Sequence, residues 1–347
     1  MSSHVTHRRG RRVALALVLC LWCWVPAAAE ASFFTTYKIA SPVRVGNLTL
    51  FPVVSKSRVP AGKGFLLLEQ GISAGLVTVR EVGSNTVRQV QTNSGRQFQT
   101  TSVGRVNRVL VTNRSDRELF IMGGEVIVGG KQDRVVQKDV LIPPHSEDVA
   151  VPVFCVEKGR WSGKSYSFRS SQQLVDLNLR SKAMFSNQGQ VWHEVNRKNA
   201  LMKTTSNTDT YQGVLRSRRL QKELAPRLAR LSAALRRVSG VAGVIVAING
   251  KVKAVDVFYS PALFGRIRDK VVRSYLVEAL SLTNARAAKV PLSDAVRFIK
   301  LAESAKVRRT LATKGDEKHL FDADNVQGLK LRSRKKKRDV HYNFYTK

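Results

Sequence analysis

Between Val43 and Glu157 the chain is a succession of short apolar runs divided by glycine, asparagine, serine and proline. This pattern constrains the fold most strongly, because strands of such length at even spacing pair into a sandwich or a barrel. The runs are NLTLFPVV, GLVTVREV, NTVRQVQT, VNRVLVTN, LFIMGG, EVIVGG, DRVVQKDVLI and VAVPVFCVE. We therefore predict a β-rich lobe over residues 41–160, either a sandwich or barrel-like.

The second half of the chain has helical periodicity instead. A spacing of four and three residues marks one apolar helix face, formed by Leu220, Leu224, Leu228, Leu231, Leu235 and Val238. That face fits core packing better than a membrane surface, although both uses remain open. Two apolar runs meet at Asn249-Gly250, which predicts a hairpin. Further helices are predicted over 261–280 and 293–304.

These patterns predict an α+β fold with strands first and helices later. A segment rich in Ser, Asn, Gln and Lys, residues 161–214, is interpreted as a polar helical insertion or lid, with helices near 172–185 and 191–202. Residues 215–347 form an α+β lobe that ends in a basic hairpin. The lobes together, residues 41–347, are predicted to make one composite domain.

Residues 1–31 have the pattern of a cleaved signal peptide. An arginine-rich start precedes thirteen apolar residues, VALALVLCLWCWV, and then a small-residue stretch that ends at Ala31. The apolar run is short for a membrane span, and no second long run follows it. We predict export, by the general or the twin-arginine route, to the periplasm or the exterior, and a mature chain without a transmembrane segment.

The charge of the chain favours anionic partners. The whole chain has 59 Lys and Arg against 25 Asp and Glu, and losing four arginines and one glutamate with the leader leaves a formal charge of +31. Such an excess attracts polyanions through steering and counterion release. An anionic polymer, an anionic membrane surface or a small polar ligand is therefore a possible partner.

A glycine-rich stretch, GGEVIVGGKQDRVVQKDV, holds the candidate site. It is not a nucleotide-binding P-loop, because Glu125 stands at the first glycine position and Gln132 at the hydroxyl position. It does gather carboxylates, an amide and cations around one turn. The candidate catalytic residues are Glu125, Asp133 and Glu157, and the candidate ligand-binding residues are Lys131, Gln132, Asp133, Arg134, Trp161 and Trp192. The alternative is an internal salt-bridge network, Asp133 with Arg134 or Glu125 with Lys131.

Other reactive residue types give weaker signals. Cys155 lies in an apolar strand and is expected to be a buried, inert thiol. The histidines beyond the leader show no metal-ligand spacing, so we predict no metal site and no cofactor. Trp161 and Trp192 could stack on a ligand or simply anchor the insertion. The tip of the predicted C-terminal hairpin, here called the basic tip, contains Arg332, Arg334, Lys335, Lys336, Lys337 and Arg338. It is interpreted as a solvated turn or as a contact for a polyanion.

The segment SDRELFIMGGEVIVGGKQDRVVQKDVLIPPHSEDVAVPVFCVEKGRW resembles the signature of the ARG and rhodanese-phosphatase-superfamily-associated domain family. NQGQVWHEV, GVIVAINGKVKAVDVF and DVHYNF extend the resemblance over roughly residues 43–345. It implies an architecture, and an association with ADP-ribosylglycohydrolases and rhodanese-phosphatase proteins, rather than a reaction. The basic run RSRKKKR departs from the short turn expected of the family.

We predict a binding or interaction module whose recognition loop runs from Glu125 to Arg134. The alternative is a hydrolase that acts on an ADP-ribose-like or phosphate-containing substrate. In that case Glu125, Asp133 or Glu157 would be the acid or base, while Lys131 and Arg134 would hold the anionic substrate.

Overall fold

The computed structural model describes residues 32–57, 64–82, 86–92, 95–101, 107–160, 166–204, 206–282 and 287–347. The predicted leader, residues 1–31, and Trp161 lie outside these ranges. Strands and helices are both abundant, and the predicted α+β class is confirmed.

Six strands close into a barrel in the order β10-β11-β13-β8-β5-β14. Their bounds are β5 Val77–Glu81, β8 Arg108–Asn113, β10 Glu125–Gly129, β11 Arg134–Val136, β13 Ser146–Cys155 and β14 Ser167–Leu174. Alternation places the apolar side chains inside: Val77 and Val79 are buried, whereas Thr78 and Arg80, which alternate with them along β5, are exposed. Of the two predicted architectures, the strand-rich lobe therefore adopts the barrel.

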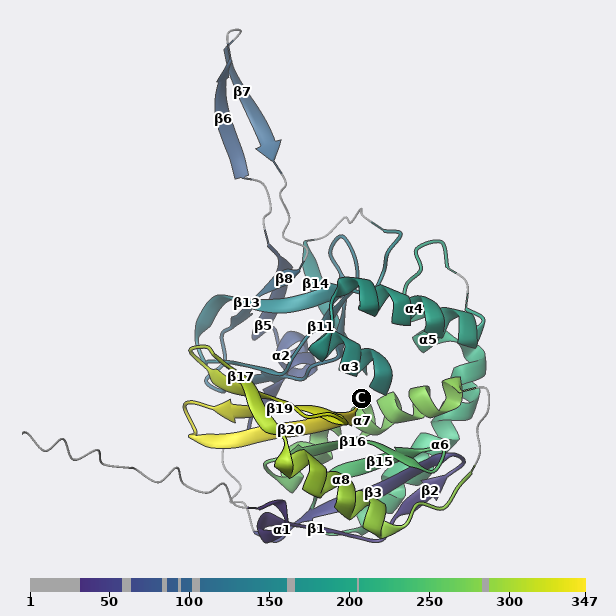
Figure 1. Cartoon of the computed structure of the whole chain (residues 1–347). Coiled ribbons are helices and arrows are strands. Elements are labelled where there is room, and N and C mark those ends of the chain that lie inside the picture. Colours follow the sequence, from purple (N-terminus) through teal and green to yellow (C-terminus); the bar gives the residue numbers. More distant parts are fainter. Residues whose placement is uncertain are drawn as a thin grey trace, which may run out of the picture.

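Two smaller sheets accompany the barrel. One has the order β12-β9-β4, with β4 at Leu66–Leu67, β9 at Leu119–Ile121 and β12 at Val140–Ile142. The other is the hairpin of β6, Thr86–Thr92, and β7, Gly95–Thr101, which pair with each other and stand away from the body in Figure 1.

The second layer is a nine-stranded antiparallel sheet in the order β1-β3-β15-β16-β20-β19-β18-β17, with β2 also paired to β3. The bounds are β1 Tyr37–Ile39, β2 Val43–Val45, β3 Leu48–Ser55, β15 Val241–Ile248, β16 Lys251–Phe258, β17 Lys306–Ala312, β18 Asp316–Asp322, β19 Val326–Ser333 and β20 Arg338–Thr346. The predicted Asn249-Gly250 hairpin is confirmed, since both residues have positive φ, 51° and 78°, as a tight mirror-image turn requires.

Helices pack on both faces of this sheet and on the barrel. Their bounds are α1 Phe33–Thr36, α2 Leu68–Ser73, α3 Leu177–Phe185, α4 Gln188–Met202, α5 Gln212–Arg216, α6 Arg218–Arg237, α7 Pro261–Ser281 and α8 Leu292–Ser304. Phe33 of α1 and Phe298 of α8 pack on one face, with Phe344 of β20. On the other face α7 contacts both β15 of the sheet and β14 of the barrel, so it lies between the two layers (Figure 1). None of the helices in the described part of the chain has the length and apolarity needed to span a membrane.

Some boundaries differ from the sequence expectation. The helix predicted near 172–185 begins only at Leu177, because Ser167–Leu174 forms β14. This strand has little apolar alternation, and its pairing with β10 and β5 closes the barrel. The segment 161–214 therefore contributes to the framework of the barrel. The strands β17 and β18 were not predicted either, since β17 is exposed along nearly its whole length and lacks a buried face.

Candidate functional site

The predicted turn is held by an arginine that the sequence analysis did not select. Nη2 of Arg160 lies 3.1 Å from Oδ1 of Asp133 and 2.7 Å from Oε2 of Glu157. Nη1 of Arg160 donates to the carbonyl of Gly130 at 2.9 Å. The same guanidinium thus joins the two carboxylates to the backbone of the turn between β10 and β11. Asp133 and Glu157 are therefore both engaged with Arg160.

These two carboxylates have opposite pKa shifts. Burial, together with the nearby charge of Glu157, raises the pKa of Asp133. Burial acts against ionisation of Glu157 as well, but hydrogen bonds from Arg160 and from the amide of Asp133 outweigh it and lower its pKa. A pair with separated pKa values is what acid–base catalysis uses, and a clamped ion-pair network can have the same property.

Arg134 is fully buried and is engaged with other side chains of the protein. Its Nη1 donates to Oε1 of Gln132 at 3.1 Å and to Sγ of Cys155 at 3.0 Å. Its Nη2 lies 3.5 Å from Oε1 of Glu81, which also accepts from the amide of Lys131 at 3.0 Å. Burial raises the pKa of the Cys155 thiol, so the side chain stays a neutral hydrogen-bond partner.

Glu125 belongs to a different cluster. Nζ of Lys270, on α7, lies 3.2 Å from Oε1 of Glu125 and 2.8 Å from Oε2 of Glu69. Burial raises the pKa of Glu125 to about 7 against the lowering effect of Lys270. Since Glu125 begins β10 and the turn follows the end of that strand, it does not join Asp133 and Glu157. The charged residues of the predicted loop are thus divided among three ionic clusters. Asp133 is joined to Arg160, Arg134 to Glu81, and Glu125 to Lys270.

Trp192 does lie beside the turn. The carbonyl of Lys158 accepts a hydrogen bond from Nε2 of Gln132 at 3.3 Å, and Nζ of Lys158 lies 5.9 Å from the centre of the Trp192 ring. Lys158 is exposed and Lys131 is half-buried. Of the predicted ligand-binding residues, Lys131 and Trp192 are thus only partly buried, and Lys158, which was not predicted, is exposed beside the Trp192 ring.

The basic tip is the turn of the predicted hairpin, between β19 and β20. Four of its six cations contact the protein itself. The partners are Asp339 for Arg332, the carbonyl of Thr313 for Arg334, the buried carboxylate of Glu118 for Lys336 and the ring of Tyr259 for Arg338. Lys335 and Lys337 are exposed. The tip is therefore partly neutralised by the protein itself and presents only part of its charge to a partner.

A second group of buried charges joins the barrel layer to the sheet. Nδ1 of His341 lies 2.6 Å from Oδ2 of Asp139, and Nε2 lies 3.0 Å from Oδ1 of Asp256. Arg180, from α3, holds Asp256 with two hydrogen bonds of 2.9 and 3.1 Å, and the hydroxyl of Tyr275 donates to the same carboxylate. Asp139, Arg180 and Asp256 are fully buried, and His341 is 1% exposed.

His341 is charged in this environment. Burial alone would lower its pKa, but the two aspartates outweigh burial and raise the pKa to about 9. The opposing charges of two carboxylates, one imidazolium and one guanidinium then balance. Such a network is stable only while all its members are present, because an isolated buried charge is costly.

The sequence contains a signal for this group that the analysis missed. His341 and Asn343 alternate along β20 with the aromatic Tyr342 and Phe344, so one face of an interior strand carries two buried polar side chains. Asn343 lies opposite Asp256 in the register, and neither its amide oxygen nor its amide nitrogen has a hydrogen-bond partner among the described residues.

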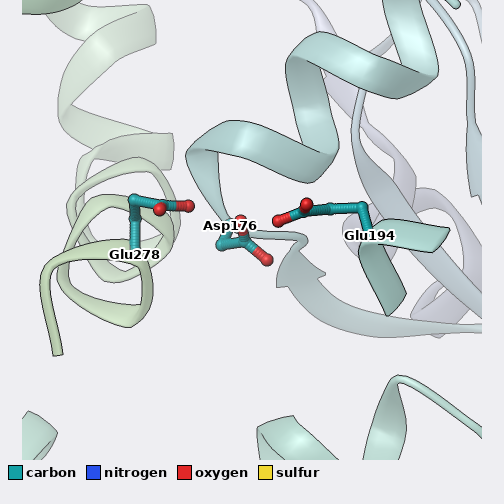
Figure 2. A group of neighbouring side chains, drawn as sticks. All are labelled: Asp176, Glu194 and Glu278. Atoms are coloured by element: carbon teal, nitrogen blue, oxygen red, sulfur yellow. The ribbon is translucent and has the colours of Figure 1, made fainter. Parts of the chain in front are cut away.

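Three more carboxylates converge beside α7, as Figure 2 shows. Asp176 caps α3, Glu194 projects from α4 and Glu278 projects from α7, and their nearest oxygens lie within 4.8 Å of one another. Three oxygen ligands at this spacing could hold a cation. The ammonium of Lys198 already lies among them, 3.2 Å from Asp176 and 2.8 Å from Glu278.

The pKa values of this cluster are also pushed apart. Burial and the neighbouring Asp176 raise the pKa of Glu278 to about 8. Burial would raise that of Asp176 too, but Lys198 and several hydrogen bonds lower it to about 2. The two carboxyl groups therefore ionise at different pH, and Lys198 lies within ion-pair distance of both. Lys198 thus occupies the place among the carboxylates that a metal ion would take.

A closed barrel, a large antiparallel sheet and an ionic layer between them define the architecture of the molecule. The chain matches the model of the ARG and rhodanese-phosphatase-superfamily-associated protein domain over residues 36–345. It therefore belongs to this family, as the resemblance predicted. No curated protein and no solved structure matches the chain significantly.

The substitution His341→Gln should flatten the pH dependence of stability. The folded-state pKa of about 9 exceeds the ordinary value of 6.5, so the bound proton stabilises the fold below pH 6.5 and its contribution disappears as the pH rises through 9. Over that window the wild type should lose on the order of 3 kcal/mol more than the variant, measured by urea unfolding. His193→Gln, at an exposed histidine, should keep the wild-type slope. If the stability of His341→Gln has the same pH dependence as that of the wild type, the titrating group is a residue other than His341.

Lys198→Met should destabilise the protein by about 3–5 kcal/mol, because it leaves buried carboxylates without their cation. Arg197→Met is the matched control: Arg197 also pairs with Glu194 but is 34% exposed, so it should cost about 1 kcal/mol or less. Chemical unfolding measures both. Added Ca²⁺ or Mn²⁺ should leave the melting temperature of the wild type unchanged, and a marked increase would show that a metal ion displaces Lys198.

Proposed function

We propose that the protein is an exported binding module for anionic partners. The observation that carries this proposal is the unequal burial of its charges. Of the 24 acidic residues beyond position 31, eleven are buried: Glu81, Glu118, Glu125, Asp133, Asp139, Glu157, Asp176, Glu194, Asp256, Glu278 and Asp316. Among the described lysines and arginines only four are buried: Arg134, Arg180, Lys198 and Lys318.

This distribution makes the surface more basic than the composition alone indicates. A buried carboxylate that is neutralised by a buried or half-buried cation contributes little field outside, whereas exposed lysines and arginines act at long range. An excess of exposed cations increases the association rate with polyanions and lowers their dissociation constant at low salt. The leader pattern of residues 1–31 supports an envelope or extracellular partner.

The recognition loop is proposed in a narrower form. Arg134 and Glu125 are engaged inside the protein, so a small polar ligand would meet Lys131, Lys158 and Trp192 at the edge of the turn. Lys131 and Lys158 would attract its negative charge, and the tryptophan ring offers a stacking surface.

A hydrolase is the second candidate, favoured by the opposite pKa shifts of Asp133 and Glu157. The position of Arg160 weighs against it. Both carboxylates bind one guanidinium, and a general acid and base must instead reach the atoms of a substrate.

Binding to inorganic polyphosphate tests the proposal. The leaderless protein should bind fluorescently labelled polyphosphate at 50 mM salt, and log Kd should increase linearly with log salt, because binding releases counterions. Anisotropy titrations at several salt concentrations measure the slope. Absence of binding at low salt, or binding that is insensitive to salt, would contradict the proposal.

The substitutions Asp133→Asn and Glu157→Gln separate the module from the hydrolase. Under the binding proposal, both variants should keep the polyphosphate affinity of the wild type to within about threefold, since each alters one of many charges. A hydrolase should hydrolyse ADP-ribose or a phosphate ester and lose about a hundredfold or more of its turnover in both folded variants. Turnover by the wild type that these variants abolish would replace the binding proposal.

A further inference from the structure

The outward face of α6 is the most basic continuous helical surface in the described structure. At 3.6 residues per turn, six exposed cations fall within an arc of about 120°, opposite the buried leucines. One of them, Arg236, lies 4.0 Å from Asp269 of α7, and the other five carry the excess charge. They are Arg218, Arg219, Lys222, Arg230 and Arg237. Within the part of the chain that the structure describes, none of these five side chains forms a hydrogen bond or ion pair.

The only acidic residue of α6 does not offset this charge. Glu223 accepts a hydrogen bond from Arg227 at 3.0 Å, one turn further along the helix. Arg227 is half-buried and lies beside the arc of exposed cations, so this pair is neutral in itself. The five exposed cations therefore keep their full excess charge.

Helix stability does not account for the position of these arginines. Arg218 and Arg219 lie in the first turn, where the helix macrodipole is positive and where acidic residues stabilise a helix. The first turn of α6 has no acidic residue. Two arginines at this end cost stability, so an interaction outside the chain is a better explanation for them than the folding of the helix.

The shape of the surface favours a flat partner. α6 runs along one flank of the molecule in Figure 1, and its outward cations extend over about 28 Å at 1.5 Å per residue. Small residues, Ala225, Pro226 and Ala229, lie exposed between them and permit close approach. No aromatic residue occurs in α6, so the helix has no aromatic ring that could stack on the bases of a nucleic acid.

We propose that α6 docks the protein on an anionic lipid bilayer, with the helix axis parallel to the surface and the five cations among the phosphate headgroups. This inference rests on the proposed function and names its partner. The helix does not insert, because Leu220, Leu224, Leu231 and Leu235 are buried in the core. Attraction is therefore electrostatic, and each cation near such a surface contributes separately to binding.

Vesicle sedimentation tests the docking surface. The leaderless protein should bind vesicles of 70% phosphatidylcholine and 30% phosphatidylglycerol and should not bind pure phosphatidylcholine. The triple variant Arg219→Gln, Lys222→Gln, Arg230→Gln should partition about a hundredfold more weakly. Glutamine keeps helix propensity, so the melting temperature should stay that of the wild type.

A second triple variant with the same loss of charge is the control. Lys314→Gln, Lys335→Gln, Lys337→Gln removes three exposed lysines near the basic tip and should weaken vesicle binding less than fivefold. Equal losses in the two triple variants would overturn the assignment to α6 and leave the proposed function in place. Binding to polyphosphate without binding to the anionic vesicles would replace the bilayer by a soluble polyanion. A wild type that binds neither would refute both proposals.

Discussion

The ion pair between Arg180 and Asp256 is the interaction on which the arrangement of the two layers depends. Asp256 belongs to the large sheet, and Arg180 belongs to α3, which begins at Leu177, three residues after the end of the barrel strand β14. Through His341 the same carboxylate connects to Asp139, whose other oxygen accepts from the amide of Gly123 at 2.7 Å. Apolar packing would allow many relative positions of a barrel and a sheet, whereas paired buried charges allow few, because any displacement leaves one of them unpaired.

The same constraint explains the surface. Acidic residues are needed in the interior to neutralise arginine, lysine and histidine between the layers, and α7 carries Lys270, Tyr275 and Glu278 toward partners from both. Acidic residues that neutralise these interior cations contribute little negative charge to the surface. A chain with more than twice as many basic as acidic residues thus folds with its cations exposed. The same distribution of charge therefore underlies both the architecture and the proposed affinity for polyanions.

Sequence patterns predicted those parts of the fold that depend on local chemistry. The barrel strands follow from apolar alternation, the β15–β16 turn from Asn249-Gly250, and α6 from its leucine spacing. Three features depended on tertiary context instead. The polar β14 is held by its neighbours, Arg160 reaches the turn from outside the selected loop, and Glu125 finds Lys270 at a sequence distance of well over a hundred residues. Patterns of neighbouring residues do not show which distant positions come together in the fold. The alternation of polar residues along β20 is the one sequence feature that marks the interior charge layer, and it was not used in the prediction.

A double-mutant cycle on Arg180 and Asp256 tests the central claim most directly. Arg180→Met and Asp256→Asn are made singly and together, and the free energy of unfolding of each is measured in urea. If the pair joins the two layers, each single change leaves a buried charge or polar group unpaired, and the double variant should lose about as much stability as one single variant, with a coupling of roughly 2–3 kcal/mol. Losses that simply add would show that the two residues act independently and that the layers are held by apolar packing.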